Sequence, residues 1–158
     1  MSGGGPGAPG AGAPGDAGRL AWLVDLQTLR RLPQRYSRAV DARDFDAVAA
    51  LFHPDAIVDG ARGSMTAAAW VEGLRTSPRA FASSMHVLGD PLVELEPGAD
   101  RASMDTYATV YQLRPAGAAD GDLMLGMRYL DDLVRRGDGW VIHRRISTML
   151  WNRTLPGA

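Results

Sequence analysis

The chain has 158 residues, 46% of them hydrophobic and 22% charged, which is enough for one globular domain with a single core. Its 17 basic and 18 acidic side chains nearly cancel, so no overall field attracts nucleic acid or an anionic membrane. The absence of cysteine excludes disulfides, thiolate nucleophiles and cysteine-based metal centres, so any chemistry must use oxygen and nitrogen side chains.

The sequence shows no signal for a membrane span or for secretion. It contains no run of about 18 apolar residues, and its N-terminus lacks a basic segment followed by an apolar one. We therefore expect a cytoplasmic protein. Residues 1–19 are almost wholly Gly, Ala and Pro, which predicts a disordered tail. The folded domain is expected over residues 20–151, with residues 152–158 as a C-terminal tail.

Helical patterns occupy the first part of the folded region. Apolar residues recur at helical spacing over residues 20–29. Further helices are predicted over 34–42, 44–52 and 66–76, the last two with Asp44 and Thr66 as N-caps. A short strand is expected over residues 56–59.

Strand patterns occupy the second part. Strands are predicted over 82–88, 91–96, 102–113, 123–134 and 140–150, joined by short turns that contain Gly, Pro and Asp. Helices followed by strands indicate an α+β domain, in which the helices pack on one face of a strongly bent antiparallel sheet. Such a cone-shaped α+β barrel encloses a natural pocket for a small apolar ligand.

His86 is the histidine that has apolar neighbours on both sides. It lies in a pattern typical of a buried strand. An imidazole in that setting is either a satisfied core residue or a base in a pocket, where burial and a carboxylate partner set its proton equilibrium.

The predicted strand that contains Asp105 and Tyr107 alternates strictly, and these two residues share its polar face. That face is either exposed to solvent or lines a pocket, and the alternation alone does not choose between the two.

Arg144 and Arg145 are adjacent in the last predicted strand, so one of them must point toward the covered face of the sheet. A charge placed there needs a ligand or an anionic partner such as Asp105. His143, beside them, is expected at the surface.

A metal site is not expected. His53, Asp55 and Asp59 lie close together in the sequence, but His-Pro-Asp after a helix is ordinary turn chemistry, and no further His lies at ligand spacing. Motifs for phosphate or dinucleotide binding and the nucleophile elbow of hydrolases are also absent.

Four stretches together carry a family resemblance: residues 36–56, Ser84-Met85-His86, residues 126–131 and residues 139–145. They resemble the SnoaL-like branch of the nuclear transport factor 2-like superfamily, and the resemblance covers roughly residues 20–151. Within that branch, the pattern is most similar to the group of bile-acid 7α-dehydratase, hexachlorocyclohexane dehydrochlorinase and scytalone dehydratase.

The resemblance implies catalytic roles for four residues. His86 would abstract a proton, Asp41 would hold its imidazole, and Tyr36 and Arg145 would stabilise negative charge or assist a leaving hydroxyl. On a regular helix, Tyr36 and Asp41 point about 140° apart, so both can face the pocket only if Asp41 ends the helix. The residues expected to contact substrate are Asp105, Tyr107, Tyr129, Arg144 and Trp151. No metal or cofactor is required.

We therefore expect a cofactor-independent lyase, a dehydratase that acts on a hydrophobic polycyclic or polyketide-like molecule. An isomerase or a cyclase with the same acid-base chemistry is the first alternative, and a non-catalytic ligand-binding or dimerisation module is the second. The resemblance also implies a homo-oligomer, either a dimer or a trimer.

Overall fold

The computed structural model describes residues 15–76, 81–118 and 120–156. The greater part of the predicted N-terminal tail, residues 1–14, lies outside the described residues. Residues 16–19 were expected to belong to that tail, but they form the first turn of helix α1. At the other end, residues 152–155 extend the last strand instead of forming a tail.

The described residues form four helices: α1 (Asp16–Arg30), α2 (Leu32–Asp41), α3 (Phe45–Ala49) and α4 (Ala67–Thr76). Pro33 fits into the first turn of α2, where its missing N–H has no helical acceptor to lose. Both predicted N-caps are confirmed: Asp44 Oδ1 accepts from the Ala47 N–H at 3.0 Å, and Thr66 Oγ1 accepts from the Ala69 N–H at 3.2 Å. None of the described helices is long and apolar enough to cross a membrane.

The strands are β1 (Phe52–Gly60), β2 (Gly63–Thr66), β3 (Ser83–Leu88), β4 (Leu92–Glu94), β5 (Arg101–Leu113), β6 (Asp122–Arg136) and β7 (Gly139–Leu155). They form one sheet in the order β2-β1-β7-β6-β5-β3, with β4 also paired to β5. The predicted α+β class is confirmed.

The prediction of a purely antiparallel sheet was wrong at one position, because β1 and β7 run parallel. Side-chain alternation is the same in both kinds of pair, so the sequence pattern could not reveal this direction. The pairing also explains why α3 is shorter than predicted. Phe52 lies opposite Ile142, and the Ile142 N–H donates to the carbonyl of Leu51 at 2.9 Å, which draws the end of the expected helix into the sheet.

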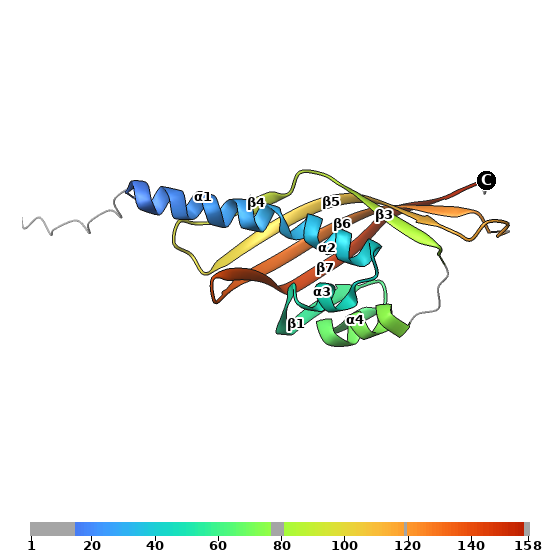
Figure 1. Ribbon diagram of the computed structural model, residues 1–158, viewed down its shortest axis with the longest axis horizontal. Helices are drawn as coiled ribbons and strands as arrows, with labels where there is room; N and C mark the ends of the chain where they lie inside the picture. The colour runs from blue at the N-terminus through green and yellow to red at the C-terminus, as the bar shows by residue number, and fades with distance from the viewer. Residues whose placement is uncertain (1–14, 77–80, 119, 157–158) are drawn as a thin grey trace, which may run out of the picture.

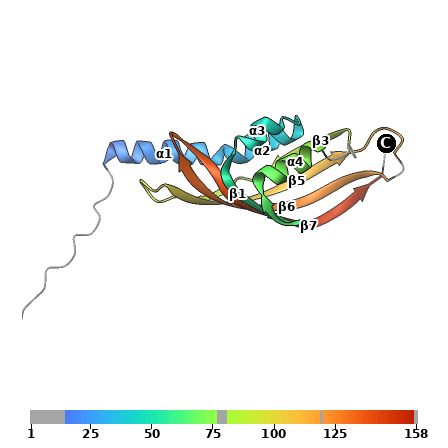
Figure 2. The ribbon, with the colours of Figure 1, turned by 90° about the horizontal axis from the view of Figure 1, so that it is seen from below.

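The helices cover one face of the sheet, and no helix of the described residues lies on the opposite face (Figure 1; Figure 2). The core lies between these two layers. It includes Leu29 and Leu32 from the helices and Leu133 and Ile142 from the strands, all with 1% exposure or less. The covered face of the sheet is therefore the inner wall of the fold.

Helix α2 ends in a complete Schellman motif. The Asp44 N–H donates to the carbonyl of Ala39 at 2.8 Å, and the Arg43 N–H donates to the carbonyl of Val40 at 3.0 Å. Arg43 adopts the left-handed conformation, with φ 59°. The motif makes Asp41 the last residue of α2, which is the condition under which both Tyr36 and Asp41 can face the interior.

Candidate active site

Asp41 and His86 are in direct contact. Nδ1 of His86 lies 2.7 Å from Oδ1 of Asp41, and the two side chains are 6% and 23% exposed. The end of α2 supplies the carboxylate, and β3, which packs against α2, supplies the imidazole. The structure therefore brings together two residues that lie 45 positions apart in the sequence.

Three hydrogen bonds fix the carboxylate of Asp41. Besides the imidazole, the Ser84 hydroxyl donates to Oδ1 at 2.7 Å, and the backbone N–H of His86 donates to Oδ2 at 2.9 Å. An ionised carboxylate can only accept, so Nδ1 of His86 carries the proton and Nε2 holds the free lone pair. Nε2 makes no hydrogen bond within the described part of the chain, so it is available as a base.

The environment of Asp41 favours its charged form. Partial burial opposes ionisation, but the hydrogen bonds from Ser84 and His86 outweigh it and hold the pKa of Asp41 below its ordinary value. The carboxylate therefore stays ionised at neutral pH, and it can stabilise the imidazolium that forms when His86 takes a proton.

Tyr36 lies beside this pair. Its ring meets the His86 ring edge-on, with centroids 6.4 Å apart, and stacks on Trp70 at 6.1 Å. Burial raises the pKa of the Tyr36 phenol well above its ordinary range. The phenol is therefore neutral and can donate a hydrogen bond.

Arg145 is the inward member of the arginine pair. Its side chain is 2% exposed and holds the fully buried Asp131 through two hydrogen bonds of 2.7 Å. The guanidinium covers the ring of Tyr36 at 4.1 Å and that of Tyr129 at 4.8 Å. Although burial opposes its charge, Asp131 holds the pKa of Arg145 above its ordinary range. The guanidinium of Arg145 thus packs against the rings of both tyrosines.

Two buried polar atoms near this stack lack partners. Nη1 of Arg145 and Oγ1 of Thr106 make no hydrogen bond to any described residue. Thr106 lies opposite Tyr129 in the sheet register, on the inner face.

Three of the predicted substrate contacts lie on the other face of the sheet. Val110 pairs with His86 in the sheet, and the buried residues of β5 lie on the same face as Val110. Asp105 and Tyr107 alternate with these residues, so their side chains point outward. Asp105 binds Arg128 at 2.7 Å, and Tyr107 is 53% exposed. Arg144 is also outward and binds Asp59 at 2.9 Å.

Trp151 does not reach the dyad either. Its indole lies over Gly126, which pairs with Thr109 of β5. Thr109 belongs to the outer face of the sheet, so the indole of Trp151 lies on that face as well. Of the five predicted substrate contacts, Tyr129 is the one that joins the inner cluster. The expected partner of the inward arginine is also different, because Asp131 takes the place suggested for Asp105.

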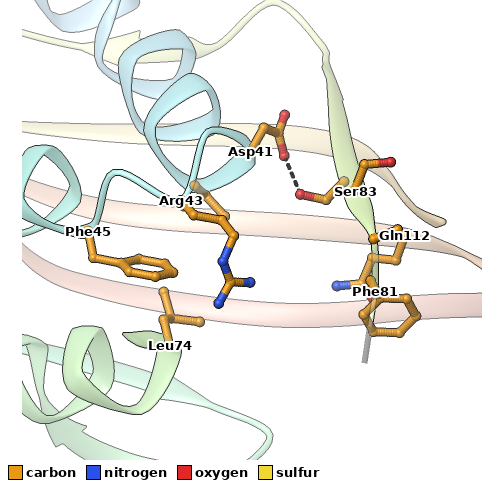
Figure 3. A pocket seen from close by; sticks show the side chains of 10 residues that line it. Asp41, Arg43, Phe45, Leu74, Phe81, Ser83 and Gln112 are labelled. Carbon is orange, nitrogen blue, oxygen red and sulfur yellow. Dashed lines mark hydrogen bonds between the residues drawn. The ribbon is translucent and has the colours of Figure 1, made fainter. Parts of the chain in front are cut away.

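A cavity of about 460 Å³ opens beside the dyad (Figure 3). Asp41 and Ser84 belong to its wall, and His86 lies two residues beyond Ser84 on the same face of β3. The remaining described lining residues are Val40, Arg43, Phe45, Leu74, Phe81, Ala82, Ser83 and Gln112. A volume of this size accepts a small organic molecule.

Sequence reasoning missed four residues of this region: Ser84, Trp70, Asp131 and Arg43. Asp131 carried a usable signal, since an Asp on an inward strand position needs a cationic partner. Arg43 carried none, because Gly and Asn are the residues that usually mark a left-handed helix end.

The fold and the site define an α+β domain with helices over one face of a bent sheet and a histidine-carboxylate pair, of which Asp41 lines a cavity. The chain belongs to the SnoaL-like domain family, whose model matches residues 23–146. Among its relatives are uncharacterized proteins of Mycobacterium tuberculosis and Mycobacterium bovis, each 29% identical over 147 residues, which cover 86% of this chain and 92% of the relative.

Solved structures show the same fold. A hexachlorocyclohexane dehydrochlorinase, LinA type 2, has a TM-score of 0.74 at 16% identity, covering 91% of this chain and 95% of its own. A protein of Novosphingobium aromaticivorans, provisionally named scytalone dehydratase, has a TM-score of 0.73 at 18% identity, with coverage of 89% and 93%. An NTF2-like protein with a cystatin-like fold from the same genus has a TM-score of 0.72 at 23% identity, with coverage of 85% and 87%. The predicted nuclear transport factor 2-like fold is thereby confirmed.

Proposed function

We propose that this protein is a cofactor-independent acid-base lyase, a dehydratase that removes water from a hydrophobic polycyclic or polyketide-like molecule. The observation that carries the proposal is the 2.7 Å contact between His86 and Asp41 beside a cavity of about 460 Å³. Two of the structurally similar proteins are named for eliminations, which agrees with the proposal.

In the proposed reaction, Nε2 of His86 takes a proton from a carbon next to a carbonyl group, and the C–H electron pair forms an enolate. Asp41 stabilises the imidazolium. The enolate then expels the β-hydroxyl as the C–O bond breaks, and the imidazolium returns its proton to the departing oxygen. The net products are an alkene and water.

The enolate oxygen needs a hydrogen-bond donor, and we assign this role to Tyr36. Its neutral phenol is part of the cluster around His86. Arg145 acts mainly through Tyr36, whose ring it covers, and its unpartnered Nη1 offers a second donor.

The same dyad suits an isomerase, which returns the proton at another carbon, and a cyclase, in which the enolate attacks an internal carbonyl. The low exposure of the His86 side chain, 6%, favours a further candidate, a domain that binds a small molecule without converting it.

The test is turnover of a panel of β-hydroxy carbonyl polycycles by purified variants. His86→Ala should abolish detectable elimination, and Asp41→Asn should lower kcat about 10²–10⁴-fold because the imidazole loses its anchor and counter-charge. His143→Ala removes a histidine outside the dyad and should leave turnover unchanged. Ligand binding that survives in both dyad variants with no turnover by the wild type would favour the binding module.

We also propose that the protein acts in the cytoplasm as a homo-oligomer that associates through the outer face of the sheet. Exposed apolar side chains on that face support the idea: Met85, Val87, Tyr107 and Trp151 are 54%, 50%, 53% and 40% exposed.

A further inference from the structure

Arg43 places a positive charge at the cavity next to the dyad. It is the one cation among the described residues that line this cavity. Figure 3 shows its guanidinium reaching into the space between Phe45 and Phe81. The side chain makes no ion pair or hydrogen bond with a described residue. Its guanidinium carbon lies over the ring of Phe45, 5.2 Å from the ring centroid.

Neighbouring arginines differ in this respect. Arg75 also lies near the ring of Phe45, 5.8 Å from its centroid, but it binds Asp46 at 2.7 Å. Arg114 lies over Phe81 and is paired with Asp120 at 3.7 Å. Among the described residues, no carboxylate forms an ion pair with Arg43, whereas Asp46 pairs with Arg75 and Asp120 pairs with Arg114.

The backbone at Arg43 is unusual for this residue type. Its φ of 59° lies at the helix-end position that glycine normally fills, and a side chain there costs about 1 kcal/mol. Strain retained at an accessible position is a reason to look for a role of the side chain. Here the strained turn carries the guanidinium to the cavity mouth.

Gln112 supplies a second polar group in the same wall. It pairs in register with Ser84, so it shares the inner face with His86 and Val110. Its side-chain amide has no hydrogen-bond partner among the described residues. Apolar side chains, among them Val40, Phe45, Leu74 and Phe81, form most of the remaining wall, which also includes Asp41, Ser83 and Ser84. The cavity therefore combines a largely apolar wall with the guanidinium of Arg43 and the side-chain amide of Gln112.

We propose that Arg43 and Gln112 form a subsite for the oxyanion of an amphipathic substrate, so that the molecule processed here is a hydrophobic carboxylic acid. This subsite rests on the proposed function in so far as it would hold the substrate of the His86 reaction. A guanidinium and an amide can each donate to a carboxylate, and Arg43 can do so with two parallel N–H groups. The apolar walls would hold the ring system.

The test compares two probes of equal shape, 2-naphthoate and its neutral analogue 2-naphthamide, by titration calorimetry. The wild type should bind the acid about tenfold more tightly than the amide, a preference typical of a partly exposed charged hydrogen bond. Arg43→Gly removes the guanidinium and relaxes the turn, so the fold is kept while the preference falls to about twofold or less. Arg43→Lys should keep part of it.

The matched control is Arg75→Gln, which removes a cation from the same aromatic ring outside the cavity and should leave the preference intact. His86→Ala should keep it as well, because binding does not require the base. If the preference for the acid is lost in Arg43→Gly but the wild type turns over no substrate, the proposed reaction is overturned and the subsite is supported. Equal affinity of the wild type for the two probes, no binding of the acid at millimolar concentration, or an unchanged preference in Arg43→Gly would overturn the subsite.

Discussion

Asp41 shows how much one residue can be constrained by its contacts. Its two oxygens accept from a hydroxyl, a backbone N–H and an imidazole N–H, which sets both the position and the tautomer of His86. The hydrogen bond from the Ser84 hydroxyl is the one that a conservative substitution can remove without changing the other two. The proposed role of His86 as a base therefore also depends on Ser84, which takes no part in the proposed chemistry.

Ser84→Ala should lower kcat by about tenfold, because Asp41 keeps two of its three hydrogen bonds while the imidazole is held less firmly. KM should change little, since the hydroxyl is committed to Asp41. Steady-state kinetics on the active substrate checks this, with Ser83→Ala as the neighbouring control. An equal loss in both variants would contradict the role assigned to Ser84.

The ionisation of Asp41 also makes a prediction about stability. Burial opposes ionisation, but the hydrogen bonds from Ser84 and His86 keep the folded pKa below the ordinary value of 3.8. The resulting stabilisation is complete above that value and is lost as pH falls through the lower folded pKa. The difference in unfolding free energy between wild type and Asp41→Asn should therefore shrink between about pH 5 and about pH 3. Urea unfolding at both pH values measures it, and a constant difference would refute it.

The buried pair of Arg145 and Asp131 gives a prediction at the same scale. Asp131→Ala leaves the guanidinium buried without its counter-ion and should cost about 3–5 kcal/mol of unfolding free energy. The double variant Asp131→Leu, Arg145→Met removes both charges and should recover most of that loss. Denaturant unfolding of the single and double variants decides it, and a double variant as unstable as the single one would contradict the interpretation.

At the scale of the element, the end of α2 determines the geometry of the site. The Schellman motif ends the helix after Asp41, so the carboxylate reaches β3 while Tyr36, one turn earlier, faces the core. The left-handed residue of the motif is Arg43, with φ 59°. One strained residue thus supports both the turn and the proposed anion subsite.

Arg43→Gly should raise the unfolding free energy by about 1 kcal/mol, because glycine adopts the left-handed conformation without a steric penalty. Arg31→Gly is the control, since Arg31 has φ −87° between α1 and α2 and gains nothing from the change. That variant should be destabilised. Thermal unfolding compares the two, and a loss of stability in Arg43→Gly would show that the side chain holds the turn.

The helices and strands also show which parts of the structure could be predicted from the sequence and which could not. Periodicity located the helices and every described strand except β2 (Gly63–Thr66), and the resemblance placed Tyr36, Asp41, His86 and Arg145 in one cluster. It failed for Asp105, because a family pattern aligned along a strand can be one residue out of register, which reverses the face. Ser84 and Arg43 could not be found, because their roles depend on contacts between α2 and β3 that no local pattern encodes.

At the scale of the whole molecule, the helices leave one face of the sheet uncovered (Figure 2). Apolar side chains lie exposed on that face, among them Val87 and Tyr107. Surfaces of this kind are typical of contacts between subunits. We propose this face as the interface of the expected homo-oligomer.

Light scattering during size-exclusion chromatography should give the wild type a mass of two or three chains. The double variant Val87→Lys, Tyr107→Lys should elute as a monomer, because charges opposed across the symmetric contact repel. Leu20→Lys, which changes a residue of α1 that is 64% exposed, serves as control and should keep the wild-type mass. A monomeric wild type would disprove the interface.

The parallel pair of β1 and β7 has a consequence for biosynthesis. Residues 52–59 pair with residues 142–146, about 90 positions further along the chain, and β7 is the strand that joins β1 to β6. Without β7 the sheet is divided between β1 and β6, and the packing of α2 against β3 is the main link between Asp41 and His86. We therefore expect the sheet that supports both residues to be completed only when the last strand emerges from the ribosome.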